Sequence, residues 1–291
     1  MGDPNEVAEK FVDHFSSVYV HDTPVVTPRV AEVKSNTSGE TITVPVITES
    51  QVLHAFKILK PIPTYICKGC KEYLVSPLTY LFNLCIQKNT FPKIWKITKI
   101  TPVPKGDKTE DMKNHRPVAL LSIPAKLMES TLYLNIFNQI KHRISSQQHG
   151  FYRSRSVQSN LLHFTQFIFS SFDRGEQVDA VYTDFQKAFD KVNHRILLQK
   201  MENLNFSKDL LLLFSSYLKN RRQYVAYKGF ESRKSECPSG VPQGSNLGPL
   251  PFLLFINDIT DVVTSSLILL YADDIKLCKS INYREDVLAA E

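Results

Sequence analysis

Two adjacent aspartates, Asp273 and Asp274, interrupt an otherwise apolar stretch of the sequence at residues 267–277. The residues before the pair have the continuous apolar pattern of a buried strand, and those after it alternate, so the stretch predicts a strand, a tight turn and a second strand. The two carboxylates then lie at a hairpin tip. Grouped carboxylate oxygens suit Mg²⁺, which binds through one or two carboxylates together with substrate phosphates. A hairpin turn without chemistry is the alternative, since aspartate is common in turns.

The composition is that of a folded protein with a moderately basic surface. The chain has 291 residues, of which 43% are hydrophobic, enough for a sizeable core in one large or two modest domains. Lysine and arginine number 35 against 29 aspartates and glutamates, and the pI is about 8.9. This excess of positive charge mildly favours a polyanionic partner.

The five cysteines are odd in number and scattered, which argues against a secreted disulfide framework. Cys67 and Cys70 have C-x-x-C spacing, but the other cysteines supply no second pair at zinc-finger spacing. We therefore expect structural or incidental cysteines. The sequence shows no signal-peptide or membrane-spanning pattern, so we expect an intracellular protein of the nucleus or cytoplasm with no membrane partner.

Along the rest of the chain, hydrophobic periodicity predicts helices and strands in no regular alternation. Helices are expected at residues 6–20, 50–60 with Ser50 as N-cap, 71–88, 122–144, 157–172, 196–204, 208–219 and 250–263, and a further one from about Ala188. Strands are expected at residues 95–104 and 178–185, a hairpin at 223–236, a glycine-rich loop at 237–248 and a linker at 21–49. This arrangement is typical of an α+β domain with a small antiparallel sheet rather than a doubly wound one.

A third aspartate, Asp184, is expected at the end of a strand. If that strand neighbours the hairpin, three carboxylates meet at one sheet edge and can hold two divalent ions, which clamp the attacking and leaving oxygens of an in-line phosphoryl transfer. The glycine-rich residues 240–245 supply backbone that can approach a ligand closely, although a surface turn is the alternative. The combination predicts nucleotidyl transfer.

Three segments resemble the successive motifs A, B and C of reverse transcriptases in order and spacing. They are DFQKAFD at residues 184–190, SGVPQGSNLGP at 239–249 and YADD at 271–274. Further matches to jockey-like (LINE-type) non-LTR retrotransposons are Phe91-Pro92, Trp95-Lys96, PKGD at 104–107, HRPV at 115–118 with Lys126 and Glu129, HGF at 149–151 with Arg155-Ser156, and FIND at 255–258. The resemblance covers residues 74–277.

The resemblance implies a right-hand polymerase fold with fingers and palm, in which a small antiparallel palm sheet carries the aspartates. It implies an RNA-directed DNA polymerase that transfers dNTPs onto the 3′-hydroxyl of a DNA primer paired with an RNA template. The cofactor would be a pair of Mg²⁺ ions, with Mn²⁺ as an alternative. Asp184 and Asp273 would be metal ligands, and Asp274 a third catalytic carboxylate that helps to hold the metal or the primer end.

For the incoming nucleotide, the resemblance implies contacts from Lys105, Arg116, Phe185, Phe189, Gln243 and Gly244. The two cations would approach the triphosphate, and the ring of Phe189 would stack below the sugar and collide with a 2′-hydroxyl. A solvated surface charge and an aromatic core residue are the ordinary alternatives for these positions. Phosphates of the bound duplex would be contacted by Arg153, Arg155, Arg221 and Arg222, whereas Asp190, His194 and Asp258 are interpreted as structural.

The sequence also departs from the family pattern. Lys-Pro-Ile-Pro at residues 60–63 replaces a longer segment, and the sequence ends at Glu291 soon after the third motif, so we expect the thumb to be missing. Residues 1–60 are interpreted as an N-terminal helix and linker extension, and residues 61–291 as fingers and palm. The alternative function is therefore a catalytically inactive remnant that only binds RNA or RNA–DNA hybrid. A metal-dependent phosphohydrolase is a third hypothesis, for which the sequence shows no general base or histidine cluster.

Overall fold

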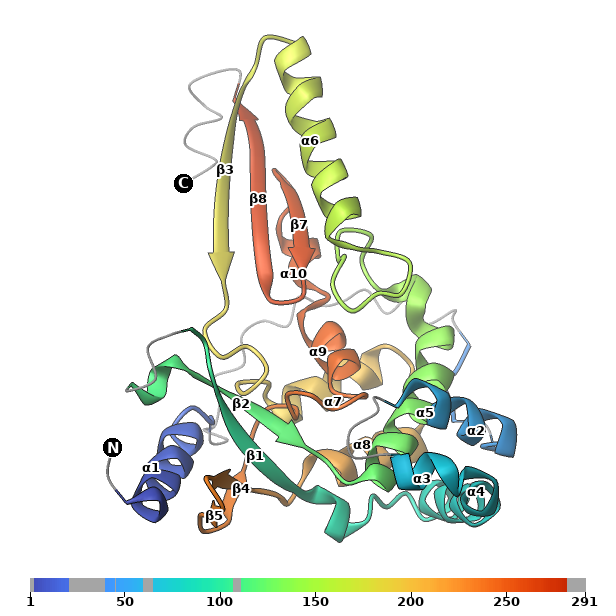
Figure 1. Ribbon diagram of the computed structural model, residues 1–291. Coiled ribbons are helices and arrows are strands. Elements are labelled where there is room, and N and C mark those ends of the chain that lie inside the picture. The colour runs from blue at the N-terminus through green and yellow to red at the C-terminus, as the bar shows by residue number, and fades with distance from the viewer. Residues whose placement is uncertain (1–2, 21–39, 45, 60–64, 107–110, 282–291) are drawn as a thin grey trace. The chain divides into compact units, whose positions relative to one another are not determined.

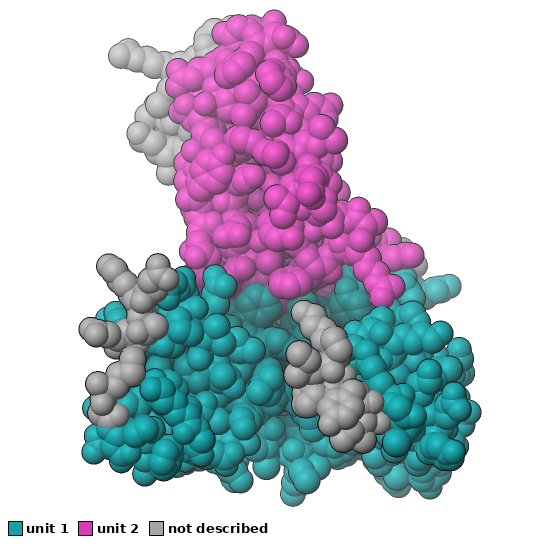
Figure 2. Space-filling model, viewed as in Figure 1, with its two compact units in different colours: residues 1–140, 189–251 teal, residues 141–188, 252–291 magenta. Residues whose placement is uncertain are grey.

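The computed structural model describes residues 3–20, 40–44, 46–59, 65–106 and 111–281. The chain divides into two compact units, one made of residues 1–140 and 189–251 and the other of residues 141–188 and 252–291 (Figure 2). Each unit contains its own β-sheet (Figure 1). Helices and strands mixed in this way confirm the predicted α+β class.

The first unit is built on a mixed sheet with the strand order β2-β1-β4-β5 (Figure 1). β1 (Ile97–Pro104) pairs antiparallel with β2 (His115–Leu120) and parallel with β4 (Arg221–Tyr227). The short strands β5 (Phe230–Glu231) and β6 (Ser235–Cys237) both pair antiparallel with β4, which confirms the predicted hairpin.

Helix α1 (Pro4–Ser16) packs on this sheet through the apolar face that the sequence predicted. The buried cluster between them consists of Phe11, Val12, Phe15, Ile100, Ala119 and Val225. The N-terminal helix therefore shares the core of the first unit. The division of the chain at residue 60 stays a prediction about family boundaries.

The remaining helices of the first unit are α2 (Glu49–Ile58), α3 (Tyr65–Gly69), α4 (Lys71–Gln87), α5 (Ile123–Ile140), α7 (His194–Asn203) and α8 (Lys208–Leu218), with 3₁₀ turns at Lys93–Lys96 and Met112–Asn114. α2 packs against α4 and α5. Its N-cap is Thr48 and not Ser50, because Thr48 and Gln51 exchange side-chain and backbone hydrogen bonds in a capping box.

The second unit is organised around an antiparallel sheet in the order β3-β8-β7, formed by β3 (Gln177–Asp184), β8 (Asp274–Ile281) and β7 (Leu267–Tyr271). α6 (Val157–Asp173) packs against β7 and β3 (Figure 1). Ile268, Leu270 and Ile275 form a small buried core with Ile259, Val263 and Leu277. The predicted small antiparallel sheet is therefore confirmed.

Two helix predictions were wrong. No helix begins near Ala188: residues 186–191 form turns, Lys187 has φ of 58°, and α7 begins only at His194. A residue in the left-handed region cannot continue a right-handed helix. The helix predicted at residues 250–263 is divided into α9 (Pro249–Ile256) and α10 (Ile259–Val262).

The predicted linker lies largely at residues 21–39, outside the described residues. In its described part, Ile42 and Ile47 are buried, and Ile42 forms an isolated bridge with Phe206, so this part packs onto the first unit. Residues 60–63 and Asp107 also lie outside the described residues. Within the described ranges, none of the helices combines the length and the apolar character needed to cross a membrane.

A buried carboxylate, Glu129 of α5, connects this helix to α8 and to the glycine-rich loop. Its Oε1 accepts a hydrogen bond from the Tyr217 hydroxyl at 3.2 Å, and its Oε2 accepts one from the Asn246 backbone N–H at 2.9 Å. Glu129 is 0% exposed, and its burial raises the pKa of its carboxyl group, which the positive charge of Arg221 partly offsets. Glu129 thus helps to anchor the loop to the interior of the first unit.

Two replacements of Glu129 should separate the effect of losing its hydrogen bonds from the effect of losing its charge. Glu129→Ala leaves the Asn246 N–H without its acceptor and the buried Tyr217 hydroxyl with only the longer bond to Ser245, and we expect it to lower the free energy of unfolding by about 3–5 kcal/mol. Glu129→Gln retains an acceptor, and we expect it to be at least as stable as the wild type at pH 7. The measurement is chemical denaturation of both variants.

The same variants also test how the stability of the protein depends on pH. Because the pKa of Glu129 is raised by folding, its contribution to stability is fully present below its unfolded pKa and is lost as the pH rises through the folded value. Glu129→Gln should therefore flatten the fall in stability with rising pH. Equal stability of the alanine and glutamine variants would contradict this account.

Candidate active site

Strand pairing brings the three aspartates together at one end of the antiparallel sheet. Asp184, the last residue of β3, lies opposite Asp274, the first residue of β8. Ala272 and Asp273 form the two-residue turn between β7 and β8. The expectation that the strand ending at Asp184 neighbours the hairpin is confirmed.

The carboxylates differ in their surroundings. Asp273 is half-buried, whereas Asp184 and Asp274 are exposed. Burial raises the pKa of the Asp273 carboxyl group, and the negative charges of Asp184 and Asp274 raise it further. A divalent cation would relieve this repulsion, so the electrostatics of the turn fit a metal ion.

Across the described ranges, no three His, Cys, Asp or Glu side chains converge closely enough to form a metal-binding group by themselves. Mg²⁺ in phosphoryl transfer requires only one or two carboxylates, because water and substrate phosphates complete its coordination. Asp184 and Asp273 fit such a site. The role of Asp274 stays a prediction.

In the first unit, Lys105 and Arg116 lie at the same end of the β1–β2 hairpin. Arg116 is opposite Val103 in the register, and the Lys105 N–H donates to the Asn114 carbonyl at 2.7 Å just beyond β1. Both side chains are exposed. The hairpin therefore presents two cations to solvent, as contact with a triphosphate would require.

Residues 238–248 form the glycine-rich loop, and hydrogen bonds hold its first half against residues 189–194. The Gly240 N–H donates to the Val192 carbonyl at 2.8 Å. Gly240 has φ of 82°, and a Cβ atom there would lie 2.7 Å from the Asp190 carbonyl oxygen. Only glycine fits both the conformation and the space, so the second motif is packed directly on the end of the first.

Three predicted residues take part in this packing. The Gln243 side-chain amide donates to the Asp190 carboxylate at 3.3 Å, and the Gln243 backbone carbonyl accepts from the Ala119 N–H at 3.2 Å. Gly244 has φ of 94°. The Phe189 carbonyl accepts from the Val241 N–H at 2.9 Å, and its side chain is half-buried. These bonds fix the loop beside β2, and the nucleotide contacts of these residues stay predictions.

Asp190 and His194 were interpreted as structural residues, and the structure shows what His194 contacts. His194 Nε2 lies 2.7 Å from the Gly240 carbonyl oxygen, so the imidazole joins α7 to the glycine-rich loop. The helix cap itself is Asn193, whose side chain accepts from the Ile196 N–H.

Two of the arginines that were predicted to contact phosphates are engaged inside the protein. The Arg155 guanidinium donates to the Ser145 and Gln148 carbonyls, each at 2.6 Å. Arg221 is 3% exposed and donates to a carbonyl of α8. Successive residues of a strand point to opposite sides, so burial of Arg221 leaves Arg222 exposed. The prediction for the buried Arg221 was wrong, that for the half-buried Arg155 stays a prediction, and Arg153 and Arg222 remain exposed candidates.

The predicted site residues are distributed over both units. Asp184, Phe185, Asp273 and Asp274 belong to the second unit, and Lys105, Arg116, Phe189, Gln243 and Gly244 belong to the first. Phe185 follows β3 directly and is 42% exposed. The first motif therefore spans the point where the chain passes from one unit to the other.

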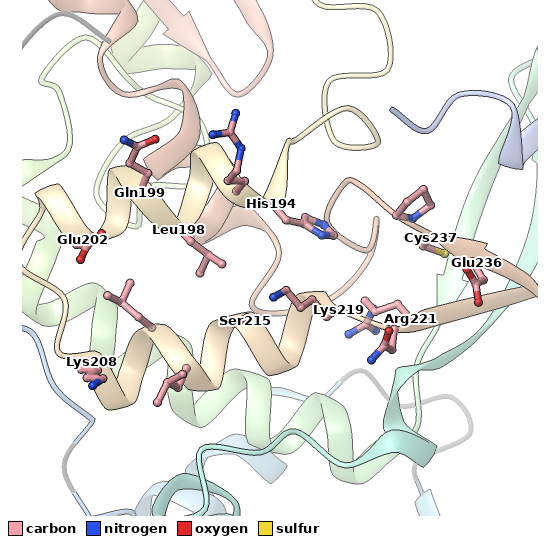
Figure 3. A pocket seen from close by; sticks show the side chains of 15 residues that line it. His194, Leu198, Gln199, Glu202, Lys208, Ser215, Lys219, Arg221, Glu236 and Cys237 are labelled. Atoms are coloured by element: carbon pink, nitrogen blue, oxygen red, sulfur yellow. The ribbon is translucent and has the colours of Figure 1, made fainter. Parts of the chain in front are cut away.

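A cavity of about 850 Å³ in the first unit lies between α7 and α8 (Figure 3). His194 and Arg221 line it, but none of the predicted catalytic or nucleotide-binding residues does. The cavity is therefore separate from the candidate site. Sequence reasoning named Glu129 only as part of the family match and missed Gln148, because a lone glutamate or glutamine gives no signal of a hydrogen-bond partner more than a hundred residues away.

Replacing Asp273 by asparagine should stabilise the metal-free protein. Folding raises the pKa of Asp273, so its stabilising contribution is present below the unfolded pKa and is lost as the pH rises through the folded value. At pH 7 without divalent ions, we expect Asp273→Asn to raise the melting temperature by about 1–3 °C. Added Mg²⁺ should raise the melting temperature of the wild type more than that of the variant.

Asp179→Asn, on the exposed surface of β3, is the matched control and should leave both melting temperatures unchanged. A metal-free Asp273→Asn variant that melts below the wild type would contradict the inferred charge repulsion.

Comparison with known proteins adds to this geometry. A family model described as reverse transcriptase (RNA-dependent DNA polymerase) matches residues 103–288. The chain is 34% identical over 216 residues to the probable RNA-directed DNA polymerase from transposon BS of Drosophila melanogaster, which covers 70% of this chain and 24% of the relative. It is 32% identical over 207 residues to the RNA-directed DNA polymerase from mobile element jockey of the same species, and these residues are 68% of this chain and 22% of the relative.

A third relative, the probable RNA-directed DNA polymerase from transposon X-element of Drosophila melanogaster, is 29% identical over 215 residues, which cover 72% of this chain and 24% of the relative. The chain thus spans about a quarter of the length of these curated relatives. The family match includes the three aspartates and the glycine-rich loop, and it extends over more than half of the chain. The chain therefore belongs to the reverse transcriptase family, and these relatives are RNA-directed DNA polymerases of mobile elements.

Proposed function

We propose that the chain is the polymerase region of a non-LTR retrotransposon enzyme, which adds dNTPs to a DNA primer on an RNA template. The observation that carries this proposal is the register of β3 and β8, which sets Asp184 beside the turn at Asp273 in a chain with the motifs of the family. The names of the jockey and BS relatives support the same reaction. We assign the three-stranded sheet to the palm and the β1–β2 hairpin to the fingers.

Asp184 and Asp273 would hold the divalent ions, Mg²⁺ or Mn²⁺. When bound, such ions would help to activate the primer hydroxyl and to stabilise the departing pyrophosphate. The chain's own contribution is to hold two carboxylates at the end of a sheet and to keep Asp273 partly withdrawn from water, which strengthens its attraction to a cation.

The residues of the first unit would select and orient the nucleotide. Lys105 and Arg116 carry positive charge that would bind the triphosphate and stabilise the negative charge that develops on it. The ring of Phe189 would exclude a 2′-hydroxyl by steric collision. Gln243 and Gly244, held by Asp190 and β2, would contact the nucleotide from a fixed loop.

Primer extension by the purified chain on an RNA template tests the proposal. With Mg²⁺ and dNTPs, we expect incorporation that falls by at least about 10²-fold in Asp184→Asn and in Asp273→Asn, because each variant removes a metal-binding charge. Asp179→Asn, on the same strand as Asp184, should keep the wild-type rate. Full activity in either active-site variant would contradict the metal assignment.

Binding of an RNA–DNA duplex, measured at several salt concentrations together with nucleotide incorporation, distinguishes a polymerase from the alternative, an inactive remnant that only binds. A chain that binds the duplex with strong salt dependence but incorporates no nucleotide would be a catalytically inactive binding remnant. The exposed Arg153 and Arg222 are the cations to replace in that case.

A further inference from the structure

One buried side chain, Gln148, forms hydrogen bonds to the backbone of the turn that carries Asp273. Its Oε1 accepts hydrogen bonds from the Ala272 N–H at 3.0 Å and from the Gly150 N–H at 2.8 Å. Its Nε2 donates to the Ala272 carbonyl at 3.3 Å. Gln148 is 2% exposed, so these bonds form in the interior of the second unit. A single carboxamide therefore satisfies both backbone polar groups of the residue before Asp273.

Ala272 needs such support because of its conformation. It has φ of 57°, in the left-handed region that residues with a Cβ adopt rarely, and it is 7% exposed. A strained backbone conformation persists only where its surroundings determine it. Glycine or asparagine would adopt this conformation with less strain, so the alanine relies on the bonds from Gln148.

The segment around Gln148 is itself fixed. The His149 N–H donates to the Leu270 carbonyl at 2.8 Å and the Leu270 N–H donates to the Gln147 carbonyl at 2.9 Å, so the segment adds a short parallel bridge to β7. Arg155 donates to the Gln148 carbonyl at 2.6 Å. The side chain of Gln148 thus projects from a rigid support.

The segment also lies directly against the turn. A Cβ atom at Gly150 would lie 2.1 Å from the Ala272 backbone nitrogen. Gly150 must therefore lack a side chain, and the Gln148 carboxamide oxygen joins the two backbones by accepting from both N–H groups.

We propose that Gln148 is a positioning residue for catalysis: it holds the backbone of Ala272 and thereby fixes where the Asp273 carboxylate is presented. The catalytic part of this inference rests on the proposed function. Gln148 acts on Asp273 only through the turn, so its replacement should change catalysis without removing any charge.

The test compares Gln148→Met with Gln147→Met in the purified chain. Methionine has nearly the length of glutamine but cannot replace its hydrogen bonds, and the Gln147 side chain bonds to Ser145 and Ser146 rather than to the turn. By hydrogen–deuterium exchange without metal, we expect residues 268–275 to exchange about 10- to 100-fold faster in Gln148→Met. Residues 221–227, in the sheet of the first unit, should exchange at the wild-type rate and so report that the protein is folded.

In primer extension, Gln148→Met should lower kcat by about 10- to 100-fold, as losses of groups that orient a metal ligand do. The KM for the primer–template should stay within about twofold, because no contact to the duplex is removed. Gln147→Met should match the wild type in both assays.

The outcomes separate the two claims. If the wild type incorporates no nucleotide, the proposed function fails, and the exchange rates alone decide whether Gln148 holds the turn. Unchanged exchange at residues 268–275 in a folded Gln148→Met variant would overturn the inference. Faster exchange together with an unchanged kcat would overturn its catalytic part.

Discussion

Asp184 lies opposite Asp274 because β3 pairs with β8 in a single register, and the candidate site depends on that pairing. Side chains alternate along a strand, so a slip of one residue would turn Asp184 to the other face of the sheet. The tight turn after β7 adds the second constraint, since it places Asp273 within the electrostatic influence of the other two carboxylates. The resulting repulsion disfavours the metal-free charged state, and a bound cation would remove it.

The two loops that carry the candidate chemistry are held in the same manner. Gln148 binds the backbone of the turn at Ala272, and Glu129 binds the backbone of the glycine-rich loop at Asn246. Both side chains are buried, and both come from segments far away in the sequence. Because they bond to main-chain groups, they determine the shape of the loops rather than their reactive side chains. Buried polar groups that are fully hydrogen-bonded give a loop a single conformation, which a catalytic site requires.

Much of the fold follows from local patterns. Apolar spacing predicted α4, α6 and α8 closely, and the apolar run broken by two aspartates predicted the hairpin of β7 and β8. The errors arose where a distant partner decides the structure. The turn at Lys187 replaces the predicted helix where the chain packs against Gly240, and Arg221 is buried and donates to a carbonyl instead of facing phosphates. The roles of Glu129 and Gln148 depend entirely on tertiary contacts, which periodicity does not reveal.

Binding of Mn²⁺ by the purified chain, followed by the electron paramagnetic resonance signal of the free ion, tests the central claim most directly. The paired aspartates predict that the wild type lowers the free Mn²⁺ signal and that Asp184→Asn and Asp273→Asn each abolish most of this binding, whereas Asp179→Asn binds as the wild type does. Equal Mn²⁺ binding by the wild type and by both active-site variants would contradict the assignment of the metal site to the β3–β8 edge.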